Sequence, residues 1–211
     1  AAVLLLVVAA LALAEWAQWP FLRHPLERVA SNALGRQVTL QGEFGLRLLG
    51  SVRLRSSLLH IAQPADRRER AAEPFLELAG LSVVIPYRTL LGLARGSAEP
   101  IAVDTFWVRR MRANLVRERD GTANWQMSAG AIEDDDAQRA PMLPTVDRLV
   151  VEEGHVRVED EVLDLDLALD LRTDESSREQ APASPGLRVE GKGTYKDLPL
   201  RLMVTSAGAL R

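Results

Sequence analysis

The feature that most constrains the fold is the run LDLDLALDL, in which leucine occupies every second position. Side chains of a β-strand alternate between its two faces, so one face of this segment is all leucine and the other is nearly all aspartate. A shift of one residue would bury the aspartates, which fixes the register. The run therefore predicts a strand with one apolar face, made by Leu163, Leu165, Leu167, Leu169 and Leu171.

The same alternation recurs through much of the chain. Residues 101–107 and 111–115 predict two strands, or one strongly bent strand with a bulge at Arg109-Arg110. Asp120-Gly121 and Glu153-Gly154 predict turns. One-sided alternation with frequent turns is typical of an antiparallel meander. We therefore expect a mainly β protein whose curved antiparallel sheet forms an apolar groove, with few short helices. Besides the leucine run, the candidate groove-lining residues are Val52, Leu54, Leu58, Val83, Ile85, Leu200 and Leu202.

The N-terminal segment predicts a membrane anchor. Residues 1–14 contain only Ala, Val and Leu, and as a helix they span roughly 21 Å at 1.5 Å per residue. Extension to residue 22 completes a transmembrane helix over 1–22 and places Trp16, Trp19 and Phe21 at the membrane interface. A cleaved signal peptide is the alternative, because Ala12-Leu13-Ala14 has the small-residue cleavage pattern. Under either interpretation the rest of the chain is exported.

Two short helices and an acidic linker organise the rest of the chain. Apolar residues recur at helical spacing over 25–34, and Gly35 suits the position after the last turn. A second helical turn is expected over 87–94. We expect a first β domain over 23–128, an acidic linker over 129–144, and a second block of strands over 145–211. The sequence begins without methionine inside an apolar run and stops after a strand-like run, so we expect a longer protein.

Composition argues against several functional classes. The net charge of −3 argues against a nucleic-acid partner, which leaves a strongly basic footprint on most proteins that bind it. The chain has no cysteine, and its three histidines lie far apart in the sequence. No serine, cysteine or histidine stands in a pattern typical of an activated nucleophile. We therefore expect a protein that is not an enzyme and that has no cofactor and no metal site.

Three short motifs resemble the N-terminal region of the AsmA family. They are LGRQVTLQG at 34–42, LLG at 90–92 and DGTANW at 120–125. They occur in the family's order, after an apolar anchor and a short helix, and the similarity covers most of residues 1–127. The motif residues that carry the resemblance are Gly35, Arg36, Gly121, Asn124 and Trp125.

The resemblance implies a single-pass protein of the bacterial inner membrane with its bulk in the periplasm and a role in outer-membrane homeostasis. It also implies kinship with bridge-like lipid-transfer proteins, whose β-strands form a trough lined by apolar side chains. The expected partners are phospholipid or another envelope lipid, the inner membrane itself, and envelope proteins. The alternative is a structural or assembly factor for outer-membrane proteins, which would pair client strands with its sheet edges.

Overall fold

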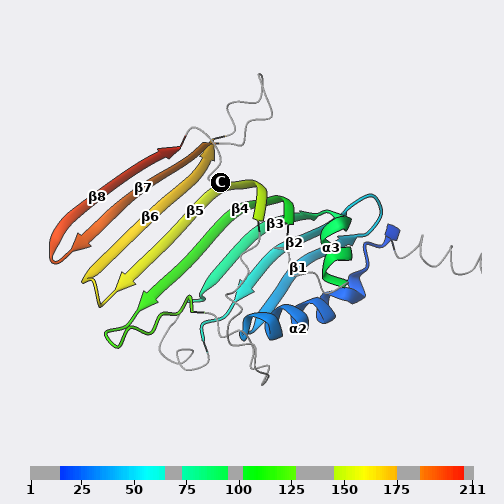
Figure 1. Cartoon of the computed structure of the whole chain (residues 1–211), viewed down its shortest axis with the longest axis horizontal. Coiled ribbons are helices and arrows are strands. Elements are labelled where there is room, and N and C mark those ends of the chain that lie inside the picture. The colour runs from blue at the N-terminus through cyan, green and yellow to red at the C-terminus, as the bar shows by residue number, and fades with distance from the viewer. Residues whose placement is uncertain (1–14, 65–72, 95–101, 127–144, 175–185, 207–211) are drawn as a thin grey trace, which may run out of the picture.

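One sheet of eight strands dominates the molecule. The computed structural model describes residues 15–64, 73–94, 102–126, 145–174 and 186–206. Within these residues the strands lie side by side in the order of the chain, from β1 to β8 (Figure 1). The prediction of a mainly β protein is confirmed. The strands are β1 (Val38–Arg47), β2 (Val52–Ile61), β3 (Leu76–Ile85), β4 (Ala102–Arg117), β5 (Thr145–Asp160), β6 (Leu165–Asp174), β7 (Gly186–Tyr195) and β8 (Leu198–Ser206).

Both predicted short helices are present. The first, α2 (Arg23–Leu34), follows a 3-10 turn, η1 (Pro20–Leu22), and begins two residues before the expected start. It ends at Gly35, which takes a φ of 62°, a left-handed conformation that glycine adopts without steric cost. The second helix, α3 (Tyr87–Ala94), has the expected bounds. No helix among the described residues is long and apolar enough to cross a bilayer. Residues 1–14 of the predicted anchor lie outside the described residues. Its described part does not form one continuous helix, because Gln18 and Trp19 have φ values of 61° and 50° and the 3-10 turn η1 follows.

The prediction that every strand pair is antiparallel is wrong for one pair. β4 and β5 run parallel, whereas the other six neighbouring pairs are antiparallel. A parallel neighbour requires a connection that returns along the whole strand. Residues 118–144, which include the predicted acidic linker, are long enough to do so. Alternating side chains look the same in either direction, so the pattern alone could not reveal this.

In β3, β4 and β5 the alternation of side chains between the two faces of the sheet is interrupted at the same level. Apolar residues three positions apart in a strand then point to the same face. Leu78 and Leu81 belong to the same core cluster although they lie three residues apart, and Gly80 between them has a φ of 67°. In β4 the exposed pair Arg109-Arg110 occupies this level, and in β5 the exposed pair Glu152-Glu153 does so. Residues 102–117 are thus one strand, and the bulge predicted at Arg109-Arg110 is absent, because the register with β3 and β5 is the same on both sides of this pair.

The hairpin turn predicted at Glu153-Gly154 is wrong. β5 runs through both residues without interruption, and Gly154 pairs with Met111 on one side and Leu171 on the other. A Cβ at Gly154 would overlap the side chain of Leu171. The glycine therefore makes room for a leucine of the next strand and does not turn the chain.

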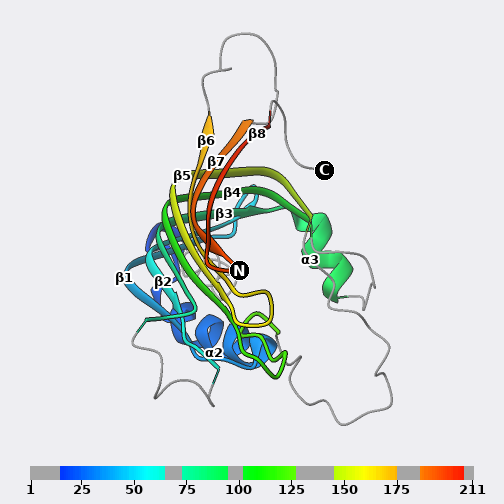
Figure 2. The same cartoon turned by 90° about the vertical axis from the view of Figure 1, so that its left-hand side faces the viewer.

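The sheet is bowed, and α2 and α3 both lie on its concave side (Figure 2). Ala30 and Leu34 of α2 pack against a buried cluster of Val38, Ile61 and Phe75. On the strands that α2 covers, the buried Val38 and Ile61 have the polar neighbours Thr39 and His60. The apolar face of the sheet is therefore its concave face.

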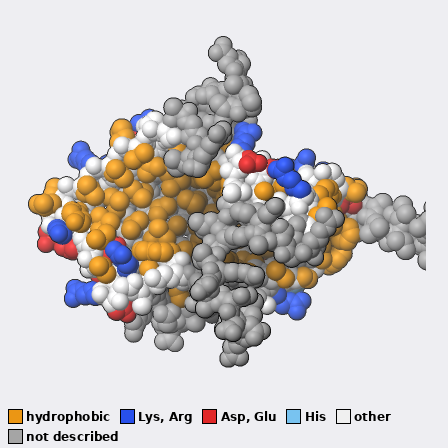
Figure 3. Space-filling model, viewed as in Figure 1, with side chains coloured by type: hydrophobic (Ala, Val, Ile, Leu, Met, Phe, Trp, Pro, Cys, Tyr) orange, Lys and Arg blue, Asp and Glu red, His pale blue; other side chains and the backbone are white. Residues whose placement is uncertain are grey.

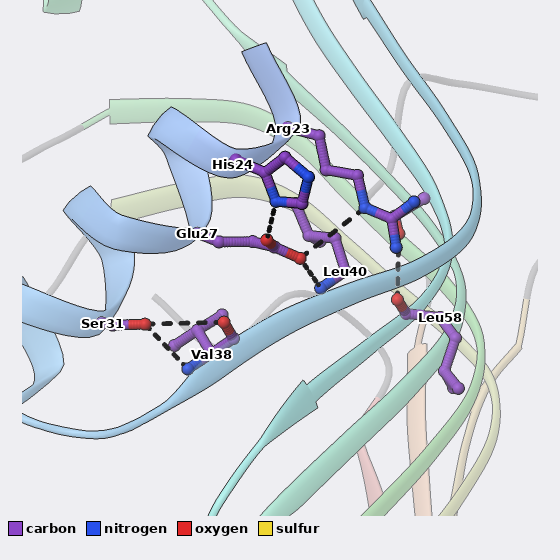
Figure 4. A network of polar contacts seen from close by, with 8 residues as sticks. Arg23, His24, Glu27, Ser31, Val38, Leu40 and Leu58 are labelled. Carbon is purple, nitrogen blue, oxygen red and sulfur yellow. Dashed lines mark hydrogen bonds and ion pairs between the residues drawn. The ribbon is translucent and has the colours of Figure 1, made fainter. Parts of the chain in front are cut away.

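Polar side chains of α2 cover the outer edge of β1 (Figure 4). Ser31 Oγ accepts a 2.9 Å hydrogen bond from the backbone N–H of Val38, and Glu27 Oε1 accepts one of 2.7 Å from Leu40. An uncovered edge strand presents unpaired N–H groups to other chains. The helix thus satisfies donors that would otherwise invite another strand.

The residues before α2 extend this cover toward the β1–β2 turn. The backbone N–H of Leu46 donates to the carbonyl oxygen of Gln18 at 2.9 Å. The Glu15 carboxylate accepts bonds of 3.1 Å from the N–H groups of both Leu48 and Leu49. It also accepts a bond from Trp19 Nε1 at 2.9 Å. Residues 15–34 therefore protect most of the length of the β1 edge.

We expect this cover to weaken in acid. Burial raises the pKa of Glu27, but hydrogen bonds from Leu40 N–H and from His24, with the nearby charge of Arg23, outweigh burial and hold the pKa below its ordinary value of 4.5. The stabilisation is fully present above that value and is lost as pH falls through the lowered pKa of the folded state. In urea unfolding between pH 6 and pH 3, Glu27→Gln should make the fall in unfolding free energy shallower. The exposed Glu43→Gln should leave it unchanged, and parallel curves for the Glu27 variant and wild type would contradict the assignment.

Candidate functional site

Two adjacent rows of side chains cross all eight strands on the concave face without a polar residue. Directly opposed residues in a sheet share a face, so each row can be followed from the strand register. One row runs Leu40, Leu59, Leu78, Met111, Gly154, Leu171, Val189, Val204. The other runs Val38, Ile61, Leu76, Ala113, Val156, Leu169, Gly191, Leu202. Together they form a continuous surface, called here the apolar wall.

Most predicted lining residues lie on this face. Leu169, Leu171 and Leu202 belong to the apolar wall, and Leu167 and Leu200 form part of a third row beside it, on either side of Gly193. Five other residues keep their predicted face. Leu165 opposes Tyr195, and on β2 and β3 Val52 opposes Ile85 and Leu54 opposes Val83.

Two of the predicted lining residues are misplaced. Leu58 opposes Gln41 and Ala79, in the row that continues to Arg110, and therefore faces away from the wall. The phase change described above extends to β2, where Ser56 opposes Leu81 and Leu59 opposes Leu78, so Leu59 takes the expected place of Leu58. Leu163 lies in the turn between β5 and β6. That turn forms because the Asp160 carboxylate accepts bonds from the N–H groups of Val162 and Leu163.

The apolar wall is covered at one end and open at the other. Near β1 its residues are buried, with Val38 and Leu40 each 4% exposed. On β8 the exposed fractions rise to 40% for Leu202 and 44% for Val204. Figure 3 shows this end as a broad hydrophobic surface over β5–β8. Soluble monomers rarely expose contiguous apolar patches of more than a few hundred Å², and larger ones mark contact sites.

The opposite face carries the charges. Its central row includes Glu77, Arg112, His155, Asp170 and Glu190, opposed in that order. Arg112 and Glu77 form an ion pair at 3.7 Å, and His155 Nδ1 lies 2.5 Å from Asp170 Oδ1. His155 is exposed, as expected for a surface residue. The described residues contain no group of three or more side chains suited to hold a metal.

In the DGTANW motif Asn124 forms a buried clamp at the end of β4, whereas the residues of the preceding turn are exposed. Asn124 is completely buried, and its Oδ1 accepts a 2.9 Å bond from Val116 N–H. Its Nδ2 donates to Asn114 O at 2.7 Å and to Gln63 Oε1 at 3.0 Å. Gly121 supplies the turn with a φ of 86°. Trp125, in contrast, is 37% exposed, so the asparagine closes this end of the sheet.

Arg36 joins the clamp to the end of α2. Its guanidinium lies 4.6 Å from the centre of the Phe75 ring, and Nη2 donates to Gln126 O at 3.1 Å. Gly35 directs the chain from α2 toward this position. Arg36 of the LGRQVTLQG motif therefore meets the residue that follows the DGTANW motif, although the two motifs are far apart in the sequence, and this contact holds the end of α2 to the segment after β4.

The three aromatic residues predicted at the membrane interface lie at the N-terminal corner. Trp16 is 83% exposed and Phe21 is 61% exposed. Trp19 is half-buried, with its ring centre 5.6 Å from that of Phe21. The sequence pattern did not reveal that Glu15, which interrupts the apolar run, binds the β1–β2 turn. Comparison with known protein families, curated proteins and solved structures found no match to this chain.

Proposed function

We propose that this protein is an inner-membrane-anchored periplasmic protein of AsmA type that carries phospholipid acyl chains along its apolar wall and so serves outer-membrane homeostasis. The observation that supports the proposal is the pair of apolar rows across eight strands. Each CH₂ group removed from water there gains about 0.8 kcal/mol. Seven strand spacings of about 4.8 Å give a path of about 34 Å, longer than one acyl chain.

The form of the wall suits movement along it as well as binding. Gly154 and Gly191 lie in its rows, and leucine side chains of β6 occupy the space above them. No charge or hydrogen-bonding side chain interrupts either row, so an acyl chain would meet no fixed polar partner. Binding by apolar burial is non-directional, and a chain held in this way can slide.

Two neighbouring residues of β8 allow a matched test. Leu202 faces the concave side, and Met203 faces the charged side opposite Glu190. Both are exposed, at 40% and 68%, so glutamate at either position should be tolerated by the fold. We expect Leu202→Glu to reduce co-purified phospholipid several-fold, measured by mass spectrometry per mole of protein, and Met203→Glu to leave it near the wild-type amount. Equal lipid content in all three proteins, or none in the wild type, would contradict the proposal.

A second candidate function uses the free sheet edge. β1 is covered by residues 15–34, whereas within the described residues β8 has β7 as its only strand neighbour. Such an edge can accept a strand of another protein, as an assembly factor for outer-membrane proteins would require. Edge pairing uses backbone groups, which do not depend on the face of the side chain. Leu202→Glu and Met203→Glu should then have equal effects on the binding of another protein's strand to β8. The same pair of variants therefore separates the two functions.

A further inference from the structure

The turn between β1 and β2 is unusual because its tip is apolar and exposed. Leu48 and Leu49 occupy positions where polar and small residues normally predominate. Leu49 is 76% exposed, although it ends a well-paired hairpin. Nothing in the described fold covers it.

Glu15 fixes this tip beside the exposed aromatic residues. Its carboxylate binds the N–H groups of Leu48 and Leu49, and the next residue in the chain is Trp16. Trp19, which donates to the same carboxylate, contacts Phe21. The strictly apolar sequence 1–14 immediately precedes Glu15. Leucine tip, aromatic rings and the end of the predicted anchor therefore lie at one corner of the molecule.

Two arginines pair directly across the hairpin below the tip. Arg47 and Arg53 are opposed in the strand register, and both are exposed. Like charges directly opposite in a sheet destabilise it, and an anionic surface would relieve this repulsion. An apolar tip beside aromatic rings and paired basic side chains combines the residue types that favour the bilayer interface.

From this arrangement we infer that the β1–β2 tip inserts into the interface of an anionic phospholipid bilayer, beside the anchor, as a second point of attachment. The inference rests on the membrane anchorage in the proposed function. It adds that the sheet is held at two points and so has a fixed orientation to the bilayer. Glu15 acts as a positioning residue, because it holds the tip against the segment that leaves the membrane.

A fluorescent label at the tip tests the inference. The chain has no cysteine, so Leu49→Cys gives a unique attachment site for bimane in the full chain. Val162→Cys is the matched control, since Val162 is also an exposed apolar residue of a hairpin turn but lies at the opposite end of the strands. Both proteins are reconstituted in vesicles of phosphatidylethanolamine and phosphatidylglycerol. We expect brominated lipid to quench the label at 49 several-fold more than at 162, and aqueous iodide to do the reverse.

Two further measurements, one on a Glu15 variant and one with a different lipid, identify the cause of insertion. Glu15→Ala in the Leu49→Cys protein should lower lipid quenching toward the value at 162, and so should replacement of phosphatidylglycerol by phosphatidylcholine. Equal lipid and iodide quenching at both positions would overturn the inference. If the protein still floats with the vesicles in that case, anchorage stands and only tip insertion fails. If the protein does not float, the anchorage in the proposed function fails with it.

Discussion

Asn124→Ala should lower the free energy of unfolding by about 3 kcal/mol, because it removes three hydrogen bonds in a fully buried site. A buried hydrogen bond contributes about 1 kcal/mol, and more is lost when a partner remains without a replacement. The site ties the segment after β4 to β4 itself and to Gln63, which follows β2. Loss of the site should therefore destabilise the first four strands.

Urea unfolding followed by circular dichroism measures this effect, and Asn32→Ala is the control. Asn32 is exposed near the end of α2, and its substitution should change stability by less than about 0.5 kcal/mol. A loss below about 1 kcal/mol for Asn124→Ala would show that the clamp contributes little. Trp125→Ala should cost less than Asn124→Ala, since the indole is partly in solvent.

Gly193→Ala should destabilise the sheet by about 3 kcal/mol, the upper end of the usual cost of overpacking. A Cβ at Gly193 would overlap the carbonyl oxygen of Asp166 and lie 2.8 Å from Leu167 Cα. These are backbone atoms of the neighbouring strand, which cannot move without disturbing the pairing of β6 and β7. We expect unfolding at a lower urea concentration, together with greater solvent exposure of β6 and β7.

Gly191→Ala provides the comparison within the same strand. The nearest atom to its added Cβ would be Leu169 Cδ2 at 2.7 Å, the far end of a flexible side chain. Rotation of that side chain should limit the cost to about 1 kcal/mol. Equal losses of unfolding free energy for the two variants would mean that the backbone of β6 adjusts to an added Cβ as easily as a leucine side chain does.

The leucine run shows what the sequence could and could not predict. Strict alternation identified β6 and its apolar face, because a half-buried strand admits only one register. Leu163 was wrongly included because alternation alone does not mark the end of a strand. The Asp160 carboxylate ends it by binding the turn, and Asp164 adopts a φ of 53° there. A hydrogen bond of this kind leaves no periodic pattern in the sequence.

The candidate site depended still more on information that the sequence lacks. The apolar wall exists because residues from eight strands are opposed, and register between strands is set by pairing rather than by pattern within one strand. Leu58 and Leu59 illustrate this, since either could continue the alternation before the phase change. Glu15 gave the opposite difficulty: a carboxylate within an apolar run looked like an interruption, although it binds two backbone N–H groups of a distant turn.

The agreement between strand order and chain order has a consequence for how the molecule is made. Every strand pairs with the one that precedes it in the sequence, so a chain that emerges N-terminus first always finds an edge ready to receive the next strand. No gap has to stay open for a later segment. The exception is the parallel step from β4 to β5, where residues 118–144 must emerge before pairing can resume. A pause in biogenesis is therefore expected at that step, with four strands assembled and their apolar side waiting for the remainder.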